Sequence, residues 1–71
     1  MKKLLKAYGF NTDMQYFEMI VESVINGNRQ QAKEQFKAMP KEGRVRFLDS
    51  IMGAWNSGLD DKDKRLFYQP I

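Results

Sequence analysis

The chain has 71 residues, of which 42% are hydrophobic, and it contains neither Cys nor His. A chain of this length forms one domain, because domains range from roughly 50 to 250 residues, so we predict a single domain over residues 1–71. The absence of Cys and His excludes zinc fingers, disulfide scaffolds and nucleophile systems that need a histidine base. The formal net charge is +3, which is too small to require a nucleic-acid partner.

The first long helix is predicted over residues 13–26. Thr12 and Gln15 have the spacing of a capping box, in which the two residues satisfy each other's free backbone N–H groups at a helix start. Gly27 follows the segment and favours the left-handed backbone of a helix end. The apolar residues of this segment recur with the spacing of one helix face: Met14, Phe17, Val21, Val24 and Ile25.

Two further helices are predicted over 29–39 and 41–56. Asn28 suits the N-cap of the first, and Pro40 suits the first turn of the second. The segment Asn56-Ser57-Gly58 ends the second. The predicted buried faces are Ala32, Phe36 and Met39 in the first helix, and Val45, Leu48, Ile51, Met52 and Trp55 in the second.

The two ends of the chain add short helices over 2–8 and 60–68. Asp60-Asp61 suits a helix start, because carboxylates are favoured at the positive end of the helix dipole. Residues 59–71 fit either a docked helix or a loose tail. Since alternation of period two is absent, the predicted fold class is all-α, a small bundle of three core helices with short terminal helices.

The turn at Gly27 is short enough to require the helices on either side of it to run antiparallel. Residues equidistant from this turn lie at similar heights, so we expect Glu22 to face Lys33 and Glu18 to face Lys37. Exposed pairs of this kind contribute little stability, roughly 0–1 kcal/mol each, but they favour one register of the hairpin.

The hairpin resembles a tetratricopeptide-type helical hairpin, in which small and aromatic residues alternate at packing positions. The resemblance covers about one repeat and implies two antiparallel helices without implying a ligand. The whole chain also looks like the short helical proteins of bacteriophages and other mobile elements. The residues that carry the hairpin resemblance are Gly27, Asn28, Ala32, Phe36, Met39 and Pro40.

The predicted helices 13–26 and 41–56 carry apolar residues around more than half of their circumference. A helix on the outside of a bundle needs an apolar stripe of only about 100° or somewhat more. Either these helices are central in the bundle, or the domain covers them by self-association or with a foreign protein. Met and aromatic residues are the favoured contacts in such interfaces. The candidate interface residues are Met19, Phe47, Met52 and Trp55.

A second surface is basic, because residues 29–46 hold six basic residues against two acidic ones. These residues form a basic stripe that could bind nucleic-acid phosphates, which is the alternative function. The stripe could instead be a solvated helix face whose positive charge balances the acidic helix across the turn. The candidate phosphate contacts are Arg29, Lys33, Lys37, Lys41, Arg44 and Arg46.

No catalytic or metal-binding residue set is predicted. Asp60, Asp61 and Asp63 have the spacing of a calcium loop start, but the Gly and Glu that complete such a loop are absent. We therefore expect a non-enzymatic protein-binding or regulatory module without cofactor, metal or small-molecule substrate. The basic N-terminus lacks the apolar stretch of a signal peptide, so we expect a cytoplasmic protein with no membrane contact. We also expect a protein partner, which is either a foreign protein or a second copy of the chain.

Overall fold

The computed structural model describes residues 1–53 and 55–68, and within these ranges it contains helices and no strand. The prediction of a small all-α bundle is confirmed. The helices are α1 (Lys2–Tyr8), α2 (Asp13–Ile25), α3 (Arg29–Ala38), α4 (Lys41–Met52) and α5 (Asp61–Tyr68).

Helix α4 ends earlier than predicted. We expected a helix over 41–56, but the structure ends it at Met52, and Gly53 has non-helical φ and ψ angles of −97° and −135°. Glycine costs roughly 1 kcal/mol relative to Ala inside a helix, which favours an end at this position. As a result, Trp55 lies in the connection to α5, where it is half-buried and packs against the core.

The predicted capping box at the start of α2 is confirmed. Thr12 Oγ1 accepts a hydrogen bond from the Gln15 backbone N–H at 3.3 Å, and Gln15 Oε1 accepts one from the Thr12 backbone N–H at 3.0 Å. Asn28 occupies the N-cap position of α3 as predicted, but its side chain makes no capping hydrogen bond.

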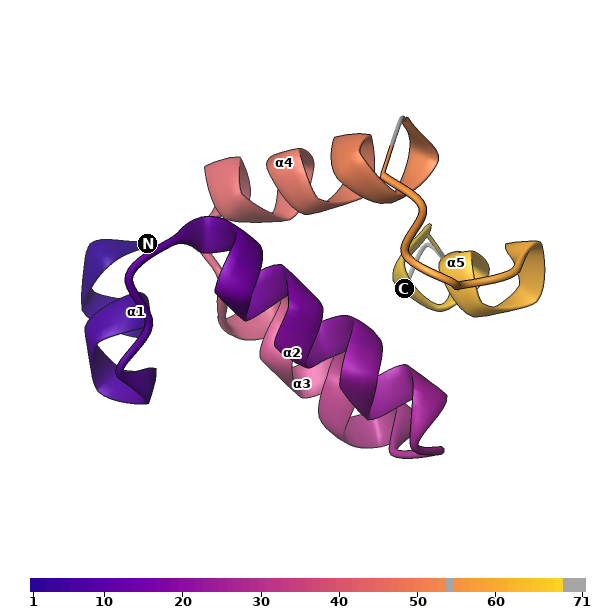
Figure 1. Cartoon of the computed structure of the whole chain (residues 1–71), viewed down its shortest axis with the longest axis horizontal. Helices are drawn as coiled ribbons and strands as arrows, with labels where there is room; N and C mark the ends of the chain where they lie inside the picture. The colour runs from indigo at the N-terminus through magenta and orange to yellow at the C-terminus, as the bar shows by residue number, and fades with distance from the viewer. Residues whose placement is uncertain (54, 69–71) are drawn as a thin grey trace.

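Helices α2 and α3 form the predicted antiparallel hairpin and lie side by side (Figure 1). Gly27 has a φ of 85° in the turn between them, a left-handed conformation that favours glycine. Two buried hydrogen bonds join the helices: the Tyr16 hydroxyl donates to the Gln35 carbonyl at 2.6 Å, and the Ser23 hydroxyl donates to Gln35 Oε1 at 2.9 Å.

The ion pairs expected across the hairpin are absent: Glu22 does not pair with Lys33, and Glu18 does not pair with Lys37. Among residues 1–53 and 55–68 the ion pairs are Arg29–Asp63 and Arg46–Asp13. The short turn fixes the heights of the two helices, but not which side of α2 faces α3. That side is taken by Tyr16, whose hydroxyl binds α3, and Glu18 and Glu22 are exposed.

Helix α4 crosses the hairpin, and α1 and α5 lie at the two ends of the molecule (Figure 1). Phe47 of α4 is fully buried at the centre of an aromatic cluster. Its ring centroid lies 5.4 Å from that of Phe17, 5.8 Å from Phe36 and 5.0 Å from Phe67. Since these rings come from α2, α3 and α5, one side chain links four helices.

The terminal helices are attached by smaller sets of contacts. Helix α1 buries Leu5, and the Met1 side chain lies against α4, so closely that a Cβ built on Gly43 would be 2.7 Å from Met1 Sδ. Helix α5 buries Phe67, so the predicted segment 60–68 is docked; residues 69–71 of the predicted tail lie outside the described residues. None of the described helices combines the length and the apolar character needed to span a membrane.

Candidate protein interface

An open groove runs between α3, α4 and α5. Its volume is about 410 Å³, and most of its lining is apolar. Lysine and arginine side chains complete the lining, and we call this feature the groove throughout. The apolar lining residues are Phe36, Val45, Leu48 and Phe67, and the cationic ones are Lys37, Lys41 and Arg44.

The spacing of residues along α4 produces one wall of the groove. Lys41, Val45 and Leu48 follow one another at i, i+4 and i+7, so they share one face of the helix. Val45 is 47% exposed, whereas Leu48 is half-buried against the core. The wall therefore combines an accessible apolar surface with a cation at its start.

The positive charges of the groove have no ion-pair partner within the described part of the chain. Lys37, Lys41 and Arg44 form no ion pair with any residue in 1–53 or 55–68. Lys37 lies in the last turn of α3, where the negative end of the helix dipole favours a cation. The groove thus presents apolar surface beside uncompensated positive charge.

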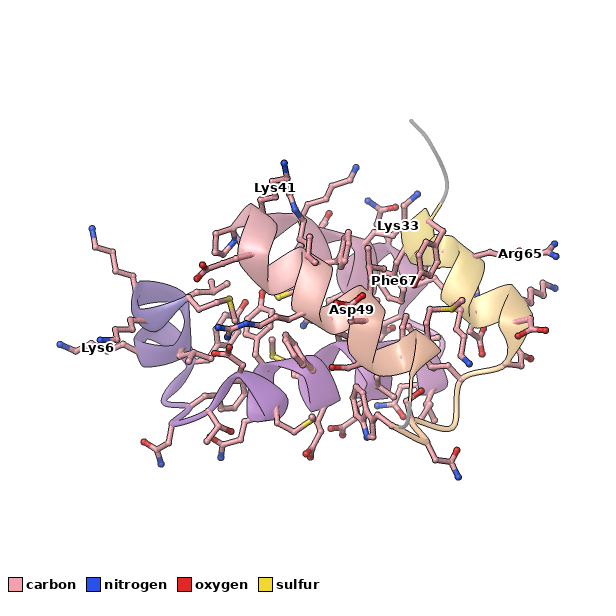
Figure 2. The ribbon with its side chains drawn as sticks, turned by 90° about the horizontal axis from the view of Figure 1, so that it is seen from above. Lys6, Lys33, Lys41, Asp49, Arg65 and Phe67 are labelled. Atoms are coloured by element: carbon pink, nitrogen blue, oxygen red, sulfur yellow. The ribbon has the colours of Figure 1, made fainter. Side chains whose placement is uncertain are left out.

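The predicted basic stripe is divided in the structure. Arg29 Nη1 lies 2.9 Å from Asp63 Oδ1, and Arg46 pairs with Asp13, so these two side chains bind carboxylates of the same chain. Lys33 is half-buried on α3 and lies outside the groove lining. Lys33 and Lys41 are both found along the same edge of the molecule (Figure 2).

The prediction that Phe47 is an interface residue is wrong, because its ring has 0% exposure and fills the centre of the core. Met19 and Trp55 are half-buried and pack against the same core. Met52 is 63% exposed and is the one of these residues with a largely free side chain. The four predicted residues therefore do not form a single surface patch.

The sequence interpretation missed the apolar residues that line the groove, although its candidate phosphate contacts include all three of the cationic ones. Val45 and Leu48 were assigned to the core face of their helix, and Phe36 to the buried face of the hairpin. The signal that could have found them is the placement of Lys41 and Arg44 on the same face as Val45. An apolar face that meets the core should not carry two cations.

The shifted pKa values belong to structural tyrosines. Burial, with a smaller contribution from the neighbouring Tyr8, raises the pKa of Tyr16 to about 12. Burial and, secondarily, the Asp49 carboxylate raise the pKa of Tyr68, whose hydroxyl donates to the Leu48 carbonyl at 3.1 Å. Neither tyrosine lines the groove. The groove itself offers no cluster of acid, base and nucleophile.

The described residues contain no group of three or more carboxylates that could hold a metal ion. The groove offers apolar side chains and positive charge. Comparison of the chain with protein-family models, with curated proteins and with solved structures found no match.

Proposed function

We propose that the chain is a small non-enzymatic protein-binding module whose groove takes an acidic amphipathic helix of a protein partner. The observation that carries the proposal is the apolar floor beside three cations that have no ion-pair partner in the described part of the chain. Helix-in-groove recognition uses apolar anchors at i, i+3, i+4 and i+7 on one side of the bound helix.

The dimensions of the groove suit such a segment. The α4 wall from Lys41 to Leu48 covers two helical turns, or roughly 10 Å at 1.5 Å per residue. Two turns of a partner helix would place its apolar anchors over Val45 and Phe36, and acidic side chains beside Lys41 and Arg44. Because the contact is small, we expect an affinity in the micromolar range, about −8 kcal/mol or weaker.

In this proposal the module acts as an accessory or regulatory protein, for example as an inhibitor of the protein that it binds. The resemblance to short bacteriophage and mobile-element proteins makes a host or cognate protein the expected target. We propose the cytoplasm as its location.

The alternative function, DNA or RNA binding, depends on the same cations. It is less well supported, because Arg29 and Arg46 already bind Asp63 and Asp13. The apolar floor of the groove also has no counterpart in a phosphate backbone. If four basic residues did contact phosphates, the logarithm of the binding constant would fall with a slope of roughly −3.6 against the logarithm of salt concentration.

Fluorescence anisotropy with a labelled helical peptide tests the proposal. The probe carries Leu at i, i+4, i+7 and i+11 with Glu at the flanking positions, and the control peptide carries Gln in place of Glu. We expect the Glu peptide to bind and the Gln peptide to bind up to about tenfold more weakly, since each exposed ion pair contributes roughly 0–1 kcal/mol.

Two matched variants locate the binding site. Lys41→Gln/Arg44→Gln removes two cations from the groove, and Lys3→Gln/Lys6→Gln removes two from α1. The groove variant should weaken peptide binding, and the α1 variant should not. Equal loss in both variants would contradict the proposal, and binding of duplex DNA without binding of the peptide would favour the alternative function.

A further inference from the structure

The outer face of α2 carries a second unpartnered surface, of opposite charge to the groove. Its four residues follow one another at i, i+4, i+8 and i+11, so they lie along one stripe of the helix. All of them are exposed, and Ile25 has 63% of its side chain in solvent. We call this surface the acidic stripe: Met14, Glu18, Glu22 and Ile25.

The packing of the hairpin explains why the acidic stripe faces outward. Tyr16 and Ile20 are fully buried, and the Tyr16 hydroxyl binds the Gln35 carbonyl of α3. At about 100° per residue, Glu18 and Glu22 lie nearly opposite Tyr16 and Ile20 on the helix. The side of α2 that binds α3 therefore turns both carboxylates to solvent.

The acidic stripe has the chemistry that the groove requires of its partner. Glu18 and Glu22 form no ion pair with any residue in 1–53 or 55–68, and the apolar side chains of Met14 and Ile25 stand at the two ends of the stripe. It is thus one side of an acidic amphipathic helix, already folded and already exposed.

We infer that the acidic stripe of one copy occupies the groove of a second copy, an inference that rests on the proposed function of the groove. Glu18 and Glu22 then lie beside Lys41 and Arg44, and one apolar end of the stripe lies over Val45. The stripe, roughly 16 Å from Met14 to Ile25, is longer than the roughly 10 Å wall of the groove from Lys41 to Leu48, so its two central carboxylates fit within the groove and its ends reach past it.

The positions of the two surfaces determine the type of assembly. Helix α2 lies along one side of the molecule, whereas Lys41, which lines the groove, projects from the opposite side (Figure 2). A contact between two different surfaces is heterologous, and it leaves a free groove at one end and a free stripe at the other. Copies joined in this way form a head-to-tail chain that adds further copies, or a ring where the rotation between copies closes, and not a closed dimer.

Sedimentation equilibrium over protein concentrations from about 10 μM to about 1 mM tests the inference, because small interfaces of this kind are weak. We expect the weight-average mass to rise with concentration beyond twice the monomer mass of 8.4 kDa. Raising the salt concentration from about 50 mM to about 500 mM should shift the rise to higher protein concentration, since salt screens exposed charges.

Two variants block one surface each. Glu18→Lys/Glu22→Lys reverses the acidic stripe, and Lys41→Gln/Arg44→Gln/Val45→Gln removes the cations and the apolar contact from the groove. Each variant alone should remain monomeric. An equimolar mixture should form a 1:1 complex that grows no further, because only one intact stripe and one intact groove can meet.

The control variant Glu34→Lys/Glu42→Lys makes the same charge change on exposed residues outside the stripe and should still assemble. A chain that stays monomeric up to about 1 mM, or an assembly that stops at a dimer, would overturn the inference. If the chain is monomeric but its groove still binds the peptide that carries Leu and Glu, only the inference of self-assembly is overturned. If the chain neither assembles nor binds this peptide, the proposed function is overturned as well.

Discussion

The α2–α3 hairpin and helix α5 are held in the molecule by different kinds of contact. The hairpin buries Tyr16, Ile20 and Ala32 completely, and its internal polar groups, Ser23 and Gln35, bind each other away from water. Helix α5 buries one large ring, Phe67. Its polar contacts, Arg29–Asp63 and Tyr68–Leu48, involve exposed or half-exposed side chains.

The difference shows which part of the fold can open independently. A buried hydrogen bond is costly to break because both partners lose water and protein contacts, whereas exposed partners return to water. Regions with few buried contacts open locally at a lower free energy than the core. We therefore expect α5 to detach without unfolding the hairpin, which would widen the groove that Phe67 lines.

The largest expected effect is that of Phe47→Ala, because the Phe47 ring joins both regions. We expect a loss of about 3–5 kcal/mol in the free energy of unfolding, which is most of the stability of a domain this small. Urea denaturation followed by circular dichroism measures it. Phe47→Leu retains most of the volume and should cost clearly less; equal losses would mean that the ring is not the centre of the core.

Phe67→Ala should cost up to about 3 kcal/mol, but mainly by releasing α5. Hydrogen exchange measured by mass spectrometry should show faster exchange in α5 and unchanged protection in α2. The control is Tyr68→Phe, which removes one exposed hydrogen bond and should leave both regions protected. If protection falls equally in α2 and α5, the two regions form one cooperative unit.

The stability of the hairpin should fall between about pH 10 and about pH 12. Folded Tyr16 keeps its proton up to about pH 12, whereas a tyrosine in the unfolded chain releases it near pH 10. The unfolded state then binds fewer protons than the folded state, so the free energy of unfolding decreases as the pH rises, by on the order of 2 kcal/mol.

Tyr16→Phe removes this titration and should flatten the corresponding part of the curve, measured by urea denaturation at a series of pH values. At neutral pH the same variant should cost about 1–2 kcal/mol, because the Gln35 carbonyl loses its buried donor. If the Tyr16→Phe variant still shows the full loss of stability at alkaline pH, the titration of groups other than Tyr16 causes that loss.

The smallest expected effect is that of Asp63→Asn, which removes the Arg29 ion pair. Arg29 and Asp63 have side chains 43% and 27% exposed, so we expect a loss below about 1 kcal/mol, decreasing further with added salt. Ser23→Ala, which breaks a buried hydrogen bond of the hairpin, should cost more and should not depend on salt. The reverse ranking would contradict the comparison between the two regions.

The parts of the fold that the sequence predicted are those determined by local spacing. The capping box at Thr12 and the turn at Gly27 depend on neighbouring residues, and both are confirmed. The ion pair Arg29–Asp63 joins residues that are distant in the chain, so it depends on where α5 docks. No local pattern determines that position.

The interface prediction failed at Phe47 for a related reason. On a helix with apolar residues around most of its circumference, periodicity does not show which side meets the core. The rotation of α4 is set by Phe17, Phe36 and Phe67, which come from three other helices. The groove arises from the same rotation, because it leaves Val45 outside.

Gly43 sits within α4 at a position where most side chains would collide with Met1. Alanine there would add roughly 1 kcal/mol of intrinsic helix preference, yet it would have to push the thioether aside. A side chain at this position would therefore stabilise the α4 helix but weaken the attachment of the first turn of the chain. The sign of the change in melting temperature for Gly43→Ala would reveal how firmly that first turn is seated.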